Sequence, residues 1–143
     1  MSGVKHRGRR VSFKLTFPEG TPSWYRRVWV ATADRIREYT AYAGVTLTEL
    51  SVHWHADYIG TSKCSLGEAA EGVITLCCSP TDEDTFLHEV AHLMVPGQHS
   101  IKWAKSYVDL MGKFMPIAKA KASAVEAWKM YPAMRKVVSI TNG

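Results

Sequence analysis

The sequence has 143 residues, of which 46% are apolar and five are tryptophan, so it can bury a core and fits one compact domain. Its formal net charge is +5, and its three cysteines include no Cys-x-x-Cys pair, which argues against a disulfide framework and indicates reduced thiols. No stretch approaches the roughly 18 consecutive apolar residues of a membrane span, and none follows the basic N-terminus as in a secretory signal, so we expect a cytoplasmic protein without a membrane partner.

The charge is uneven along the chain. Residues 1–10 carry a formal charge of +4, residues 11–100 carry −5 and residues 101–143 carry +6. We expect residues 1–10 to form a basic, flexible tail and residues 11–143 to form a single domain. The two basic ends could contact nucleic acid through its phosphates. Solvated helix faces are the simpler interpretation, because no basic cluster interleaved with aromatic residues accompanies the charge.

The N-terminal third predicts a strand and then a long helix. Residues 11–17 alternate apolar and polar side chains, which is the period of a half-buried strand. Thr21 and Pro22 are typical of a helix start, as a capping hydroxyl and a proline at the first helical position. The helical pattern continues to Tyr42, and Gly44 would stop it. The buried stripe of this helix is predicted to contain Trp24, Val28, Ala31 and Ile36.

Two further strands are predicted in the central part of the chain. Residues 45–55 are rich in β-forming side chains, with a break in the alternation near Glu49 that indicates a bulge. Residues 72–78 form a short, nearly continuous apolar run that is typical of a strand. This run ends with Cys77 and Cys78, which we interpret as small buried thiols, while a metal role for either one stays open.

The second half of the sequence predicts three helices. An acidic, cap-rich start favours a helix over residues 81–95, which a Pro-Gly pair then stops. Ser100 is a good cap for a second helix that reaches about residue 115. Pro116 would break that helix and begin a last one, which ends near Tyr131.

The first of these helices carries His88-Glu89-Val90-Ala91-His92, a sequence of the form H-E-x-x-H. Residues four apart share a helix face, so His88 and His92 can bind one zinc ion, and Glu89 beside them can take a proton from the water that the ion activates. The neighbouring side chains are apolar, and a polar trio without a metal would leave buried polar groups unpaired on such a helix. Two core histidines satisfied by ordinary hydrogen bonds are the alternative.

A catalytic zinc site commonly has three protein ligands and one water, so a third ligand is needed. His99 is the best candidate, because the helix ends at Pro96 and Gly97 permits a sharp reversal that returns the chain to the metal. The alternative for His99 is a surface histidine that precedes a helix cap. Asp109 and Glu126, on the downstream helices, are competing third ligands.

The run from His88 to Met94, followed by His99-Ser100-Ile101-Lys102-Trp103, resembles the pattern of the SprT-like zincins, small H-E-x-x-H metallopeptidases. In that family a histidine follows the H-E-x-x-H helix, and an aromatic residue stands four positions after it. The resemblance, which covers about residues 73–110, implies that His88, His92 and His99 bind zinc, that Glu89 is the catalytic base, and that Trp103 packs behind the third histidine.

The same resemblance implies an α+β fold with a single zincin-like domain. Its parts would be an N-terminal helix, a small mixed β-sheet, the active-site helix with the H-E-x-x-H motif, and C-terminal helices. The strand before the active-site helix, here residues 72–78, is expected to line the cleft, where an extended peptide could add along the sheet edge.

Metal-assisted hydrolysis of a peptide bond is the reaction that these residues favour. Zinc would polarise the scissile carbonyl and activate water, while Glu89 accepts the proton and returns it to the leaving amine. Three residues are candidates for stabilising the oxyanion, each also explained as structural: His55, Tyr58 and Tyr107. His53 and His55 share a strand face and could suggest a second metal, although a hydrogen-bonded or solvated pair is the simpler interpretation.

We therefore expect a zinc metallopeptidase that acts on a peptide or protein substrate. Two alternatives come from other classes: a nucleic-acid-associated SprT-like protein that acts on DNA-bound proteins, and a non-catalytic zinc-binding interaction domain. Steeply salt-dependent DNA binding would support the first alternative. Bound zinc without any protease activity would support the second.

Overall fold

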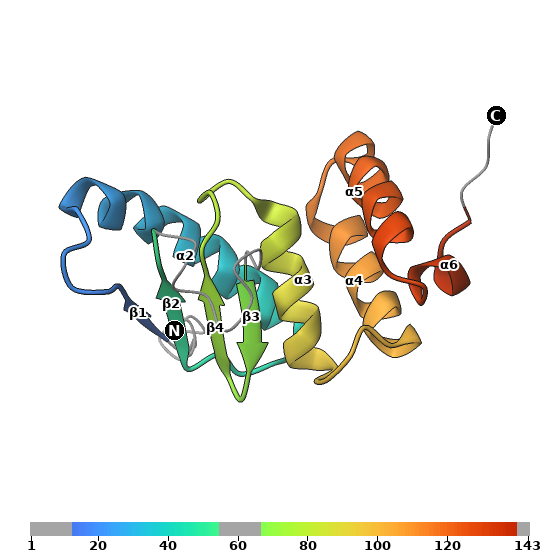
Figure 1. Cartoon of the computed structure of the whole chain (residues 1–143), viewed down its shortest axis with the longest axis horizontal. Coiled ribbons are helices and arrows are strands. Elements are labelled where there is room, and N and C mark those ends of the chain that lie inside the picture. Colours follow the sequence, from blue (N-terminus) through green and yellow to red (C-terminus); the bar gives the residue numbers. More distant parts are fainter. Residues whose placement is uncertain (1–12, 55–66, 140–143) are drawn as a thin grey trace, which may run out of the picture.

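A computed structural model describes residues 13–54 and 67–139. The elements in chain order are β1 (Lys14–Thr16), α2 (Ser23–Ala43), β2 (Glu49–Val52), β3 (Gly67–Ala70), β4 (Val73–Leu76), α3 (Glu83–Met94), α4 (Ile101–Phe114), α5 (Ile117–Met130) and α6 (Met134–Val137). In Figure 1 the sheet and α2 lie on one side of α3, and α4, α5 and α6 lie on the other. The predicted α+β class is confirmed, with an N-terminal helix, a sheet, a central helix and C-terminal helices in the expected order.

The four strands form a mixed sheet in the order β1-β2-β4-β3. β1 pairs with β2 and β2 pairs with β4 in parallel, whereas β3 pairs with β4 antiparallel. The strand predicted at residues 72–78 is confirmed as β4. Its predicted place at the cleft is wrong, because β4 lies between β2 and β3 inside the sheet. The described strand at that edge is β3, which was not predicted, since Gly-Glu-Ala-Ala contains no β-forming side chain.

The helix α2 forms where predicted, but its predicted buried stripe is wrong for all but Ile36. Trp24 and Val28 are 58% and 44% exposed and Ala31 is also exposed, whereas Trp29 is fully buried against Phe86 of α3. The helix is rotated by about one residue from the predicted phase. This phase buries two large aromatic side chains where the predicted stripe had one, and the buried residues are Trp29, Ala33, Ile36 and Tyr39.

Two local predictions near α2 are also corrected. The Thr21 hydroxyl does not cap the helix but donates a hydrogen bond to the Pro18 carbonyl. The strand predicted at residues 45–55 is shorter, since only β2 is regular, and its pairing with β4 runs without a bulge from Glu49 to Val52. Leu47 precedes the strand and is buried in the core, which accounts for the apparent break in alternation.

Several predictions concern residues outside the described ranges. These are the basic tail at residues 1–10, together with Val11, His55, Tyr58 and Cys64.

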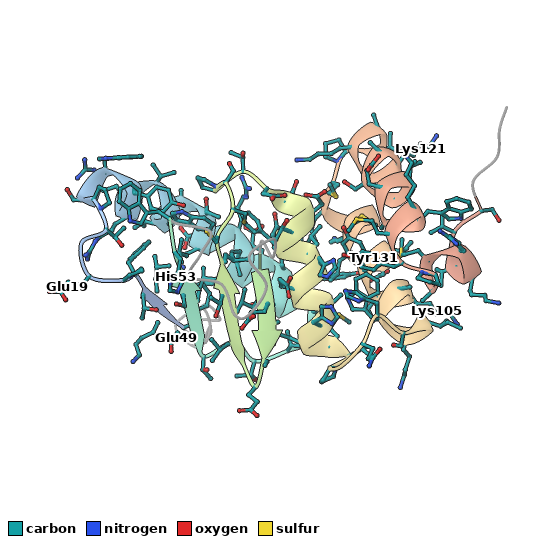
Figure 2. All side chains as sticks on the ribbon, in the orientation of Figure 1. Glu19, Glu49, His53, Lys105, Lys121 and Tyr131 are labelled. Carbon is teal, nitrogen blue, oxygen red and sulfur yellow. The ribbon has the colours of Figure 1, made fainter. Side chains whose placement is uncertain are left out.

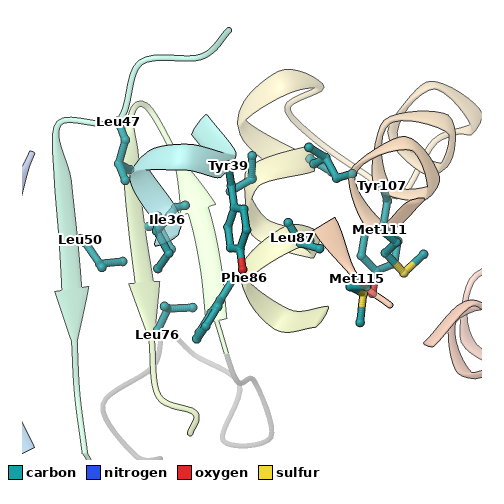
Figure 3. Packing of buried hydrophobic residues seen from close by; sticks show 14 of the residues in the cluster. Ile36, Tyr39, Leu47, Leu50, Leu76, Phe86, Leu87, Tyr107, Met111 and Met115 are labelled. Carbon is teal, nitrogen blue, oxygen red and sulfur yellow. The ribbon is translucent and has the colours of Figure 1, made fainter. Parts of the chain in front are cut away.

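The helix α3 is buried on two sides by different parts of the core (Figure 3). Phe86 packs toward the sheet and α2, while Leu87 points toward Tyr107 and Met111 of α4. Leu87 is fully buried, as are Val90 and Ala91. These contacts fix the rotation of α3 about its axis, and its remaining face is open to a cavity.

The C-terminal helices follow the predicted boundaries. The Ser100 hydroxyl caps α4 by accepting a hydrogen bond from the Trp103 backbone N–H at 3.1 Å, and Pro116 precedes the first residue of α5. The one-turn helix α6 was not predicted. Within residues 13–54 and 67–139, no helix combines the length and apolarity that crossing a bilayer requires.

Candidate metal centre

A side-chain cap fixes where α3 begins, and the helix then presents one face to the cavity. Asp82 accepts hydrogen bonds from the backbone N–H of Thr85 at 3.4 Å and from its hydroxyl at 2.9 Å. With this start, helical periodicity places one polar set of side chains on a single face. Its members line the cavity and are Asp84, Thr85, His88, Glu89 and His92.

Three imidazoles converge at this face. One ligand nitrogen from each of His88, His92 and His99 lies within 4.8 Å of the other two, and the Nε2 atoms of His88 and His99 are 3.1 Å apart. His99 reaches this position because the chain reverses at Gly97, whose φ is +103°. The predicted fold-back after the helix is therefore confirmed.

Burial keeps these imidazoles neutral. It lowers the pKa of His88 to about 3 and that of His92 to about 4, with a further lowering from the charge of the neighbouring histidines, and it also lowers the pKa of His99. A neutral imidazole presents a lone pair, which is the form that binds a metal.

The donor set fits a zinc ion. A tetrahedral zinc site with Zn–N distances of about 2.0–2.1 Å holds its ligand nitrogens roughly 3.3–3.4 Å apart, close to the spacing of His88 and His99. A hydrogen bond between those two rings would account for that pair alone, whereas His92, one helical turn from His88, makes the group a set of three nitrogen donors. Within the described ranges, the group of His, Cys, Asp and Glu side chains that could hold a metal consists of these three histidines.

Glu89 lies next to the imidazoles and is 5% exposed. Burial, and then the nearby charge of Glu68 on β3, raise the pKa of Glu89 to about 8. A methyl group at position 67 would stand 3.2 Å from both Cγ and Oε2 of Glu89, so the carboxylate lies directly against Gly67 of the edge strand. A carboxylate with a raised pKa in a cleft has the character of a general base.

Two aromatic residues fix the imidazole rings. Trp103 contacts all three, with ring centroids 4.8 Å from His88, 5.3 Å from His92 and 4.6 Å from His99, and its Nε1–H donates to the His88 carbonyl at 3.3 Å. The expected packing of Trp103 behind the third histidine is confirmed. Tyr131 stacks on the other side of His99, with centroids 4.1 Å apart and planes 23° apart.

A cavity of about 470 Å³ opens in front of the imidazoles. β3 forms one wall, α3 carries His88 and His92, and α5 with Tyr131 forms the wall facing β3. In Figure 2 Tyr131 lies between α3 and the C-terminal helices. A volume of this size is in the range of sites that bind organic ligands, about 300–1,000 Å³.

The competing ligands do not join the imidazoles. Asp109 accepts a hydrogen bond from the exposed Tyr42 hydroxyl at 3.0 Å, and Glu126 lies at the cavity wall with an ion pair to Lys129 at 3.3 Å. Cys77 and Cys78 are half-buried and belong to no metal-binding group among the described residues.

The other histidine and tyrosine candidates are also accounted for. His53, directly after β2, contacts the Ser51 hydroxyl at 3.1 Å, and its proposed partner His55 lies outside the described residues, as does Tyr58. Tyr107 lines the cavity, but its hydroxyl donates to the Asp84 carbonyl at 3.4 Å, which favours the structural interpretation of this residue.

Three residues of the site were missed from sequence: Gly67, Glu68 and Tyr131. The first two belong to a strand with no β-forming residues, so no pattern placed them at the cavity. Tyr131 stands 32 positions after His99 and meets it only through the packing of α5 and α6 against α4. The sequence offered one indication of a special position for Tyr131, which is that it precedes Pro132 at a predicted helix end.

Comparison with known proteins identifies one solved structure with a similar fold. No protein-family model matches this sequence, and no curated protein matches it. The crystal structure of Wss1 from Saccharomyces cerevisiae matches with a TM-score of 0.55 at 21% identity, over 71% of this chain and 86% of that one. The chain therefore has a Wss1-like fold, and the predicted resemblance is supported at the level of the fold alone.

Proposed function

We propose that this chain, with its Wss1-like fold, is a zinc-dependent hydrolase of the metallopeptidase type. The observation that supports the proposal is the convergence of three neutral imidazoles at a cavity, with the buried carboxylate of Glu89 beside them. Neutral histidines favour metal binding, and a carboxyl group beside the imidazoles is placed to take a proton from a water bound to the metal.

Each residue has a separate role in this reaction. His88, His92 and His99 hold the metal, and Trp103 keeps their rings in place. Zinc, when bound, supplies Lewis acidity that polarises a carbonyl and lowers the pKa of a water. Glu89 takes the proton from the attacking water and passes it to the nitrogen of the leaving amine.

The substrate that best fits the cavity is an extended peptide. Among the described strands, β3 is the edge strand next to the metal site, and its residues Glu68 and Ala69 line the cavity. Backbone N–H and C=O groups on such an edge can pair with an added strand. A peptide bound in this way lies in front of α3 and brings a backbone carbonyl to the imidazoles.

The test is metal analysis of the purified wild type beside His88→Ala and Glu89→Gln, with cleavage of quenched-fluorescent peptide mixtures as the activity assay. We expect about one zinc per wild-type chain, loss of zinc in His88→Ala, and retained zinc without cleavage in Glu89→Gln. Zinc in the wild type with no cleavage of any peptide would favour the non-catalytic interaction domain instead.

A nucleic-acid-associated role is the second candidate. It is supported by the charge of residues 101–139, which hold eight basic and two acidic side chains. Lys105 on α4 and Lys121 on α5 are both exposed, and Figure 2 shows them on outer faces, away from Tyr131. DNA affinity that falls steeply with salt and is reduced by Lys105→Glu with Lys121→Glu would support this role, and no binding at low salt would remove it.

A further inference from the structure

The cavity contains few side chains that could donate a hydrogen bond to a reacting carbonyl. No lysine, arginine, asparagine or glutamine lines it within the described residues. Besides the imidazoles, the side-chain donors on its wall are four hydroxyl groups, which belong to Thr85, Ser123, Tyr107 and Tyr131.

Three of these hydroxyl groups already donate to the protein. The Thr85 hydroxyl donates to Asp82 at 2.9 Å, the Ser123 hydroxyl to the Asp84 carboxylate at 3.4 Å, and the Tyr107 hydroxyl to the Asp84 carbonyl at 3.4 Å. Among the described residues, Tyr131 is the remaining hydroxyl on the cavity wall, and no hydrogen bond from it to that part of the chain is found.

The position of Tyr131 is fixed by its backbone and by its ring. Its N–H donates to the Ala127 carbonyl at 2.8 Å, and its own carbonyl accepts from Met134 at 2.9 Å, so it is held at the junction of α5 and α6. The ring stacks on His99 and lies 5.5 Å from the His88 ring and 5.4 Å from the Trp103 ring. This packing limits movement of the ring, so Tyr131 keeps its place at the cavity wall before any substrate enters.

Tyr131 and Glu89 approach the imidazoles from facing walls. Glu89 lies against Gly67 on the β3 side, whereas Tyr131 comes from the α5 side. The two groups share the cavity, since both Glu89 and Tyr131 line it. A peptide along β3 would therefore have the base on one side of its carbonyl and a hydroxyl donor on the other.

We infer that Tyr131 is a further catalytic residue, whose hydroxyl donates a hydrogen bond to the oxygen of the scissile carbonyl as that oxygen gains negative charge. This inference rests on the proposed hydrolase function. A donor held in place before the reaction stabilises the transition state more than the bound substrate, because the charge on the oxygen develops only during attack. Tyr131 would thus act on kcat rather than on substrate affinity.

The test uses Tyr131→Phe in the zinc-loaded full chain, because this change removes the hydroxyl and keeps the ring on His99. We expect kcat to fall by about 10²–10³-fold, with KM and zinc content close to those of the wild type. The matched control is Tyr42→Phe, whose hydroxyl contacts Asp109 outside the cavity and whose loss should leave kcat unchanged.

A binding measurement provides a readout that does not depend on turnover. A phosphinic peptide carries a tetrahedral centre with a charged oxygen, so it resembles the transition state, while the corresponding product peptide does not. By calorimetry, Tyr131→Phe should weaken phosphinic peptide binding at least about 10-fold and leave product binding unchanged.

The outcomes separate this inference from the proposed function. Wild-type kcat and phosphinic peptide affinity in Tyr131→Phe, with no cleavage by Glu89→Gln, would overturn the role of Tyr131 and leave the hydrolase proposal standing. Loss of zinc in Tyr131→Phe would make the tyrosine a support for His99 and would also overturn its role as donor. A wild type that neither cleaves peptides nor binds the phosphinic peptide would overturn both.

Discussion

Glu89 and Gly67 are in direct contact across the boundary between α3 and the edge strand β3. A Cβ atom at position 67 would stand 3.2 Å from two atoms of Glu89 and 2.9 Å from Cδ2 of Leu76. Leu76 is fully buried and Glu89 is 5% exposed, so neither has open space into which to move. The absence of a side chain at position 67 is therefore what allows the carboxylate to lie between the strand and the imidazoles.

Gly67→Ala should displace this carboxylate. We expect kcat to fall by at least about 10-fold, because a small misplacement of a catalytic group is costly, and the free energy of unfolding to fall by about 1–3 kcal/mol from overpacking. Zinc content should not change, since no imidazole contacts position 67 in this way. Peptide cleavage and urea denaturation measure both effects.

Gly112→Ala is the matched control for Gly67→Ala. Gly112 lies within α4, and an added methyl group would meet no atom within 4 Å. Alanine favours helix over glycine, so this variant should be more stable by about 0.5–1 kcal/mol with unchanged kcat. Equal kcat in the two alanine variants would contradict the role assigned to the contact between Gly67 and Glu89.

The identity of the third ligand can be tested by removing His99. We expect His99→Ala to weaken zinc binding by more than about 100-fold, since even residues that only orient a ligand contribute 10–100-fold. Asp109→Ala and Glu126→Ala should keep wild-type affinity, because neither carboxylate belongs to the converging group. Competition with a chelating dye measures all three affinities. Full zinc retention in His99→Ala would return the assignment to the two carboxylates.

The metal-free protein should lose stability in acid because of its histidines. The pKa values of His88 and His92 are lowered to about 3 and about 4, whereas in the unfolded chain they return to about 6.5. As the pH falls from about 6.5 to about 3, the unfolded chain binds protons that the folded chain does not, so the free energy of unfolding decreases. Urea titrations of chelator-treated protein should show this decrease, and His88→Phe should reduce it.

Glu89 should lower the free energy of unfolding of the metal-free protein as the pH rises. Its pKa is raised to about 8 in the folded metal-free protein from an ordinary value of 4.5, so its contribution to stability is complete below about 4.5 and is lost as the pH rises to about 8. Glu89→Gln removes this loss and should be more stable than the wild type at pH 8 by more than about 1 kcal/mol. A wild-type stability that stays flat from pH 5 to pH 8 would contradict the burial of this carboxylate.

The helix α3 could be predicted from sequence because its signals are local. One segment contains a cap at Asp82, an apolar pattern from Phe86 and a stop at Pro96. The return of His99 toward this helix needs only the reversal at Gly97. The phase of α2 could not be fixed in the same way. Two apolar stripes compete on that helix, and the choice between Trp24 and Trp29 is decided by contact with Phe86, which lies 57 positions after Trp29.

The cavity walls depend even more on distant contacts. β3 has the composition of a loop, and it is a strand only because β4 offers an unpaired edge. Tyr131 reaches His99 through the packing of three helices. The metal-binding side of the site was therefore predictable, whereas the side that would hold and polarise a substrate was not.

Trp103 provides the last test, because it links the imidazoles to the core. Its ring is fully buried and contacts all three histidines, and its Nε1–H donates to the His88 carbonyl. Trp103→Phe removes this hydrogen bond and part of the ring, so we expect zinc affinity to fall by about 10–100-fold and the free energy of unfolding to fall by about 1–3 kcal/mol.

The control for Trp103→Phe is Trp24→Phe, since Trp24 is 58% exposed and touches no imidazole among the described residues. This exposed change should alter stability by less than about 0.5 kcal/mol and leave zinc affinity unchanged. If Trp103→Phe lowered stability without lowering zinc affinity, Trp103 would be a core residue alone, and the imidazoles would owe their arrangement to α3 and to the turn at Gly97. If zinc affinity fell in both variants, the effect would not come from contact with the imidazoles, because only one of the two tryptophans has that contact.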